Sequence, residues 1–200
     1  MPGRTSTTRE PIVFAAVLAA GSSRRFGRHK LLEKVEGKPL VRQAAEVART
    51  VCGDRSILVT GYESAAVSAA AGDAPQYLIV NDHHEEGMGG SIALAARSVS
   101  QVADALILLF ADQPLVTSRH VKTLVGTWSG APDEIVATAF AATVGPPVLF
   151  PRGAFDALGR LSGDAGAKSV LRDPRFDVRT VPFEAAAIDI DTPADLERLR

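Results

Sequence analysis

Short runs of apolar residues alternate along this chain with longer segments in which apolar residues recur at helical intervals. The short runs are continuous rather than mixed with polar residues, as in the strands of a parallel sheet that is covered on both faces. The pattern therefore restricts the chain to folds with a buried, mostly parallel sheet. The predicted strands are Ile12–Ala20, Ser56–Thr60, Tyr77–Val80, Ala105–Phe110 and Ile135–Phe140.

The segments between these runs have the spacing of helices. Strand–helix units that repeat with short loops favour an α/β fold. We expect a three-layer α/β/α, Rossmann-like arrangement in which helices cover both faces of a mostly parallel central sheet. The predicted helices are Leu40–Val51, Ser64–Ala71, Ser91–Val99 and Ser118–Trp128, the third after a glycine-rich turn at 87–90.

The last third of the chain is less regular. Pro147–Phe150 and Val178–Phe183 are predicted either as antiparallel additions to the sheet or as a small flap. A final helix begins near the C-terminus, where Thr192 is placed to cap it, Pro193 occupies the first turn and Asp195 stands three residues after the cap.

The composition excludes several classes of protein. A net charge of −1 provides no global field for nucleic acid or anionic lipid, so any anion site must be local. The single cysteine, Cys52, rules out an intrachain disulfide and a thiolate zinc site, and its apolar surroundings predict packing. Residues 1–11 lack the apolar core of a signal peptide, and no apolar run approaches the roughly 20 residues that span a bilayer. We predict a flexible leader at 1–11, one domain at 12–200, a cytoplasmic protein, and neither nucleic-acid nor membrane partners.

The densest chemical signal follows the first predicted strand, where glycines and serines precede a group of cations. Glycine lets backbone N–H groups turn toward a ligand, and a run of such donors makes a nest for phosphate oxygens that the cations neutralise. The alternative, a solvated basic loop, does not explain the position at the carboxyl end of a strand, where open α/β sheets bind ligands. The residues of this segment are Leu18, Ala19, Ala20, Gly21, Ser22, Ser23 and Gly27, with the cations Arg24, Arg25, Arg28 and Lys30.

A carboxylate follows another strand. Asp112 comes directly after a continuous apolar run, where a charge is costly unless it is solvated or bound to a cation. Mg²⁺ accepts one or two carboxylates together with phosphate oxygens and water. Asp112 with Asp191, or with Asp189, therefore predicts a magnesium site, and Asp191 is preferred. The alternatives are a turn aspartate before Pro114 and, for Asp191, a simple helix start.

The segment from Leu18 to Lys30 resembles L-A-A-G-x-S-x-R-x-G-x-x-K, the signature of MobA-like nucleotidyltransferases of the molybdenum-cofactor type. Later blocks are similar to that family in the same order: E-G-M-G-G-S at 86–91, L-L-F-A-D-Q-P-L at 108–115, P-V-L-F at 147–150, S-G-D-A-G-A at 162–167 and D-I-D-T-P at 189–193. The residues of these blocks are most similar to those of the cytidylyltransferase branch. The resemblance thus implies CTP rather than GTP, Mg²⁺, and a molybdopterin phosphate as acceptor.

The resemblance also implies a role for each matching residue. Arg25, Lys30 and Asp112 would be catalytic, and Asp112, Asp191 and Asp189 would meet the metal. Nucleotide contacts would come from Leu18, Ala19, Ala20, Gly21, Ser22, Ser23, Arg25, Lys30, Asn81, Gly87, Gly89, Ser91 and Asp112. Acceptor contacts would come from Gly145, Pro147, Gly163 and Asp164. Two loops keep a second interpretation, because Ser91 and the 163–166 segment each suit a helix cap.

The implied reaction is in-line attack of an acceptor phosphate on the α-phosphorus with release of pyrophosphate. It needs no general base, since positioning and charge neutralisation suffice. The partners are small molecules, and a molybdoenzyme or its maturation factor is considered as a protein partner. Three alternatives stay open: another acceptor (guanylyl transfer to molybdopterin, a sugar phosphate or an isoprenoid phosphate), a non-catalytic cofactor carrier, and a Rossmann oxidoreductase, which the missing G-x-G-x-x-G disfavours.

Overall fold

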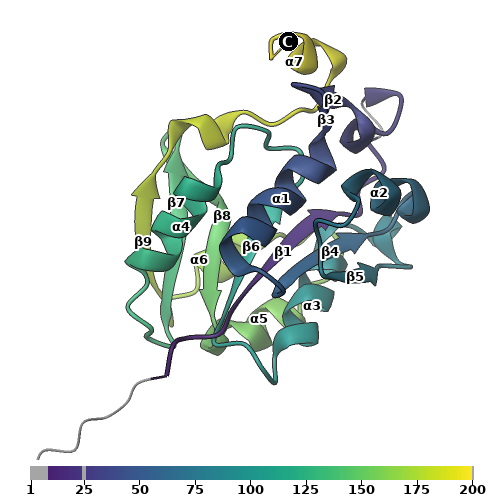
Figure 1. Cartoon of the computed structure of the whole chain (residues 1–200). Helices are drawn as coiled ribbons and strands as arrows, with labels where there is room; N and C mark the ends of the chain where they lie inside the picture. The colour runs from purple at the N-terminus through teal and green to yellow at the C-terminus, as the bar shows by residue number, and fades with distance from the viewer. Residues whose placement is uncertain (1–8, 24–25, 200) are drawn as a thin grey trace, which may run out of the picture.

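The computed structural model describes residues 9–23 and 26–199. These residues form a seven-stranded sheet in the order β5-β4-β1-β6-β8-β7-β9 and a separate hairpin, β2-β3 (Figure 1). The strands are β1 (Val13–Ala19), β2 (Lys34–Val35), β3 (Lys38–Pro39), β4 (Ser56–Thr60), β5 (Tyr77–Val80), β6 (Ala105–Phe110), β7 (Glu134–Phe140), β8 (Thr143–Pro151) and β9 (Asp177–Pro182). The helices are α1 (Leu40–Cys52), α2 (Ser64–Ala71), α3 (Met88–Val99), α4 (Ser118–Thr127), α5 (Phe155–Gly159), α6 (Lys168–Leu171) and α7 (Pro193–Glu197).

Both faces of the sheet are buried, as the continuous apolar runs predict. In β1, Ala15 and Val17 pack into the core on one face, while Ala16 and Leu18 pack into the core on the other. Helices α1, α2 and α4 cover the first face, and α3, α5 and α6 cover the second (Figure 1). Strands β5, β4, β1 and β6 are parallel neighbours. The predicted three-layer α/β/α fold with a mostly parallel sheet is confirmed.

The last third of the sheet confirms one expectation and corrects another. β8, which contains Pro147–Phe150, is antiparallel to β6 and β7 and lies between them. β9 runs parallel to β7, so the prediction of an antiparallel strand or flap over Val178–Phe183 is wrong. The reason is the connection: the chain passes through α5 and α6 before β9, and such a crossover allows a parallel neighbour.

The start of α3 is a second correction. The helix begins at Met88, and Gly87 precedes it, so 88–90 are helical and Ser91 is not a cap. Tertiary packing overrides the low helix propensity of the glycines. A Cβ at Gly89 would lie 2.7 Å from the backbone nitrogen of Ser162, which only glycine avoids.

The C-terminal helix begins as predicted. Thr192 accepts a hydrogen bond from the backbone N–H of Asp195, the Asp195 side chain bonds back to the cap, and Pro193 stands in the first turn. A small apolar cluster holds this end of the chain beside the β2-β3 hairpin (Figure 1). Its buried members are Phe26, Val35, Leu40, Ile190 and Leu196.

The leader predicted at 1–11 lies largely outside the described residues, which begin at Arg9. The Arg9 guanidinium donates to the Asp104 carboxylate at 2.8 Å, and the backbone N–H of Ile12 donates to the same carboxylate. Over the part of the chain that the structure describes, no helix has the length and apolar content needed to cross a membrane.

Candidate active site

A polar cavity of about 550 Å³ lies beyond the carboxyl ends of β1 and β6. This is the edge at which open parallel sheets bind ligands. Its walls bring together segments that are far apart in the sequence: the loop after β1, the turn after β6, the start of α3 and the stretch before α7. The lining residues are Leu18, Ala19, Ala20, Gly21, Ser22, Ser23, Lys30, Leu31, His84, Glu85, Gly87, Met88, Ser91, Phe110, Asp112, Asp164, Asp189 and Asp191.

The glycine- and serine-rich loop forms one wall of this cavity. Ser23 has a left-handed backbone (φ 52°), and its buried hydroxyl oxygen has no hydrogen-bond partner among the described residues. An unpaired buried hydroxyl is costly, so this atom is suited to a ligand oxygen. Arg24 and Arg25, the first cations of the predicted nest, lie outside the described residues.

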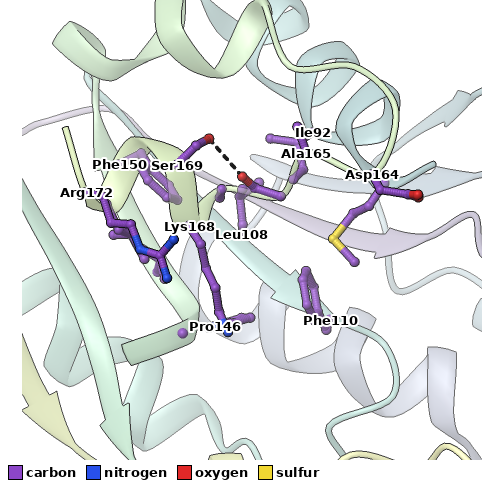
Figure 2. A pocket seen from close by; sticks show the side chains of 16 residues that line it. Ile92, Leu108, Phe110, Pro146, Phe150, Asp164, Ala165, Lys168, Ser169 and Arg172 are labelled. Atoms are coloured by element: carbon purple, nitrogen blue, oxygen red, sulfur yellow. Dashed lines mark hydrogen bonds between the residues drawn. The ribbon is translucent and has the colours of Figure 1, made fainter. Parts of the chain in front are cut away.

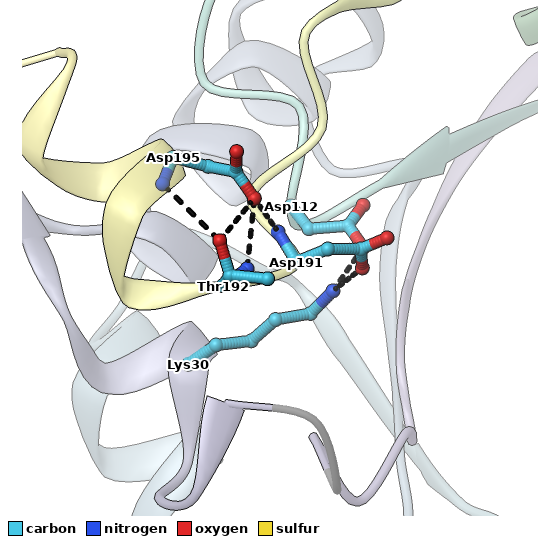
Figure 3. A network of polar contacts seen from close by, with 5 residues as sticks. All are labelled: Lys30, Asp112, Asp191, Thr192 and Asp195. Atoms are coloured by element: carbon cyan, nitrogen blue, oxygen red, sulfur yellow. Dashed lines mark hydrogen bonds and ion pairs between the residues drawn. The ribbon is translucent and has the colours of Figure 1, made fainter.

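Lys30 stands at the centre of the acidic wall (Figure 3). Its Nζ lies 2.7 Å from Oδ2 of Asp112 and 3.1 Å from Oδ1 of Asp191. Burial alone would lower the pKa of Lys30, but the charges and hydrogen bonds of the two aspartates outweigh burial and raise that pKa above its usual value. The ammonium group therefore stays protonated and joins two carboxylates from distant parts of the chain.

Asp189 is the third carboxylate of the cavity. Burial, followed by the nearby charge of Asp112, raises the pKa of Asp189 to about 6. A backbone hydrogen bond from Ile190 N–H to the Asp112 carbonyl, 2.9 Å long, ties the segment of Asp189 and Asp191 to the turn after β6. The predicted group of Asp112, Asp189 and Asp191 thus shares one cavity.

The donor set fits a divalent cation that is shared with a substrate. Oδ1 of Asp112 is buried and has no hydrogen-bond partner in the described chain, so one carboxylate oxygen is left for a cation. Among the described residues, no group of three or more His, Cys, Asp or Glu side chains is arranged to hold a metal alone. Mg²⁺ tolerates this arrangement because it usually completes its coordination with phosphate oxygens and water.

The loop before α3 meets the loop before α6 at the opposite wall. A Cβ at Gly87, where φ is +117°, would lie 2.4 Å from the Gly163 backbone, and the Gly89 N–H donates to the Gly163 carbonyl at 2.9 Å. This close approach places Gly87 and Asp164 on the cavity surface. Gly89 and Asn81 are not on its lining. The Asn81 side chain instead donates to the Ser91 hydroxyl at 3.0 Å.

A second cavity of about 520 Å³ adjoins the first (Figure 2). Met88, Phe110 and Asp164 line both. Of the predicted acceptor residues, Gly145 and Asp164 line the second cavity, whereas Gly163 and Pro147 do not. The Pro147 carbonyl accepts a hydrogen bond of 2.7 Å from the Thr138 hydroxyl.

One buried side chain near the site was not assigned from sequence. Gln113 donates from Nε2 to the carbonyl of Ala186 at 2.8 Å, and its side chain opposes the burial that raises the pKa of Asp189. It therefore positions the carboxylate segment relative to Asp112. The sequence signal that could have identified Gln113 is its position directly after Asp112. Leu31, His84, Glu85, Met88 and Phe110 also line the cavity without having been predicted.

The carboxyl edge of the sheet thus combines a glycine- and serine-rich loop, a lysine and three aspartates in one cavity of a three-layer α/β/α fold. A model of the MobA-like NTP transferase domain matches residues 15–180. The chain belongs to the MobA-like NTP transferase family, as its resemblance to that family implied.

Several relatives extend over nearly the whole chain. Purine catabolism protein PucB of Bacillus subtilis (strain 168) is 29% identical over 204 residues, which cover 96% of this chain and 98% of that protein. Nicotine blue oxidoreductase of Paenarthrobacter nicotinovorans is 30% identical over 200 residues, covering 94% and 97%. The crystal structure of Rv0371c from Mycobacterium tuberculosis H37Rv matches with a TM-score of 0.82 at 30% identity, covering 96% and 98%. A further crystal structure of Rv0371c is a complex with manganese.

Proposed function

We propose that the protein transfers a nucleotidyl group, CMP from CTP, to the phosphate of a molybdopterin-type acceptor and releases pyrophosphate. The observation that supports this most directly is the cavity in which Lys30, Asp112 and Asp191 meet the glycine- and serine-rich loop. Family membership supports nucleotidyl transfer in general. The choice of CTP rests on the L-A-A-G and A-D-Q-P wording of the chain.

In this proposal the triphosphate lies against the loop from Gly21 to Ser23, whose backbone N–H groups and free Ser23 hydroxyl accommodate phosphate oxygens. Lys30 lies on the same cavity surface and offsets the charge that develops on the departing pyrophosphate. The acceptor phosphate is already ionised, so the protein needs to orient it in line with the α-phosphorus but not to deprotonate it.

Asp112, with Asp189 or Asp191, would hold Mg²⁺ in this site. Without a cation, the three aspartates would repel the phosphates of the nucleotide. The ion would offset this repulsion by neutralising phosphate charge. Two observations support this part of the proposal: the unpartnered Oδ1 of Asp112, and the manganese in the crystal structure of Rv0371c. Burial, followed by the nearby charge of Asp112, raises the pKa of Asp189, and a bound cation would favour its ionised form.

The test is pyrophosphate release from CTP or GTP in the presence of Mg²⁺ and molybdopterin. Asp112→Asn keeps the shape of the side chain but removes its charge, and it should reduce turnover by about 10²–10³-fold. Asp133→Asn, an exposed site outside the cavity, is the matched control. Release that depends on GTP would keep the class of enzyme and change the nucleotide. Release equal in Asp112→Asn and the control would contradict the proposal.

A second candidate follows from the relative named nicotine blue oxidoreductase. An oxidoreductase of this fold would bind a nicotinamide or flavin cofactor, and the chain lacks the G-x-G-x-x-G segment that such binding ordinarily uses. Oxidation of NADH or NADPH, together with no pyrophosphate release from CTP or GTP, would favour this candidate over the transferase.

A further inference from the structure

The second cavity differs in chemistry from the first. Its walls are mainly apolar and come from the ends of β6 and β8 and from α3 and α6. Leu108, Val148 and Phe150 form a buried floor, and Met88 and Leu171 add accessible apolar surface. The cavity opens into the acidic one through shared residues, including Phe110 and Asp164. A flat apolar group would lose little hydration here and would gain contacts with the side chains.

Two cations line this cavity. Lys168 is the first residue of α6, and Arg172, the residue after α6, lies on the opposite side from Asp164 (Figure 2). Both are exposed, they are one helical turn apart, and neither forms an ion pair within the described parts of the chain. Both also line a neighbouring cavity, whose other walls come from β7, β8 and β9. Two unpaired cations beside an apolar surface attract an anion.

The anion that they would bind is not the triphosphate of the nucleotide. Lys168 and Arg172 do not line the acidic cavity, which already has its own cation in Lys30. The reacting phosphate of the acceptor must also reach the nucleotide through the shared wall near Asp164. An anion bound by Lys168 and Arg172 must therefore be a separate group on the acceptor.

We propose that the apolar cavity binds the body of the acceptor, a flat ring system, and that Lys168 and Arg172 pair with a second anionic group on it, distinct from the phosphate that reacts. This inference rests on the proposed function. It adds a basis for selectivity: the site prefers ring-containing acceptors with a second anionic group over simple monophosphates.

A direct binding experiment tests the cavity without any turnover. Pterin and pterin-6-carboxylate share a flat heteroaromatic ring and differ by one anionic group, and both are fluorescent. The wild-type protein should bind the carboxylate roughly 10-fold more tightly, as expected for charge-assisted hydrogen bonds. In the double variant Lys168→Met/Arg172→Met, this preference should be lost, so that the two affinities become about equal.

The matched control is Lys122→Met/Arg160→Met, which removes two exposed cations outside the cavity. It should keep the wild-type preference, and melting temperatures of both variants should show that they are folded. Equal affinities for the two pterins in the wild type, no binding of either, or the same preference in both double variants would each overturn the proposal.

Kinetics separate this inference from the proposed function. With CTP and molybdopterin, the Lys168→Met/Arg172→Met variant should raise KM for molybdopterin about 10-fold, while KM for CTP stays within about two-fold. An equal rise in both KM values would contradict a role confined to the acceptor. If the wild type releases no pyrophosphate, the proposed function fails, and the pterin affinities still decide whether the cavity recognises an anionic ring system.

Discussion

The two adjoining cavities are opposite in character although they share a wall. The first contains Asp112, Asp189 and Asp191 around a single lysine, and the second contains apolar side chains together with Lys168 and Arg172. A polyphosphate cannot approach the first without a cation, whereas a ring system with an anionic group can enter the second directly. Under the proposed function, nucleotide and metal would occupy the first cavity and the acceptor the second.

The largest expected effect is on the acidic side. Lys30→Met removes the one cation that joins Asp112 to Asp191, and turnover should fall about 10²–10³-fold because charge on the leaving pyrophosphate is no longer offset. Pyrophosphate release measures this, with Lys34→Met, at an exposed site, as the control. Near-wild-type turnover of Lys30→Met would remove this lysine from the mechanism.

The wall of the acidic cavity formed by the loop before α3 is expected to respond next. Gly87→Ala forces a Cβ against the Gly163 backbone at a positive φ, and it should cost about 1–3 kcal/mol of unfolding free energy. Thermal unfolding should show a lower midpoint. Gly126→Ala, in an open helical position of α4, should instead raise it slightly. A midpoint for Gly87→Ala at or above that of Gly126→Ala would mean that the two loops do not approach so closely.

Gln113 offers a test of how the carboxylates are held. Gln113→Leu removes the hydrogen bond to Ala186 and frees the segment that positions Asp189. The Mg²⁺ concentration needed for half-maximal pyrophosphate release should rise about 10-fold, as for other residues that orient metal ligands. KM for the acceptor should stay unchanged, since the apolar cavity is left intact. A change confined to KM for the acceptor would contradict this prediction, because it would show that Gln113 acts on the apolar cavity and not on the carboxylates.

The smallest expected effect lies beneath the acceptor side. The His120 ring stacks on Phe183, its Nε2 lies 2.9 Å from the Thr138 hydroxyl, and burial lowers its pKa. The unfolded chain therefore binds a proton before the folded one does. The stabilisation from neutral His120 is complete above its ordinary pKa of about 6.5 and declines as the pH falls below it.

Denaturant unfolding between about pH 5 and pH 8 measures this effect. A His120→Gln variant should lose part of the decline in unfolding free energy at acidic pH, whereas the exposed His83→Gln should retain it. Identical pH profiles for the two variants would show that His120 does not contribute. The affinities of the wild type for pterin-6-carboxylate and pterin should be measured at the upper end of this pH range, because the stabilisation from neutral His120 is complete there.

Much of the nucleotide side was predictable because its signals are local. The strand before Gly21, the loop itself and the strand before Asp112 each show their character within a few residues. Parallel strands bring their carboxyl ends to one edge, so the loop and Asp112 were expected to meet. The acceptor side was less predictable. Lys168 stands in a short helix with no motif and Arg172 directly follows it, and only the packing of α6 beside β8 gives them a cavity to line.

The sequence by itself determined the α/β/α layering, most element boundaries, the C-terminal capping box and the family. Apolar periodicity, cap residues and motif wording are local properties of a chain, so they can be read without knowing which segments pack together. Only the tertiary structure decided that β8 lies inside the sheet. Its hairpin turn uses Ala141 and Ala142 at positive φ, where glycine or asparagine is the usual signal. Packing likewise decided that Lys30 joins Asp112 to Asp191, because contacts between distant residues depend on how whole elements pack.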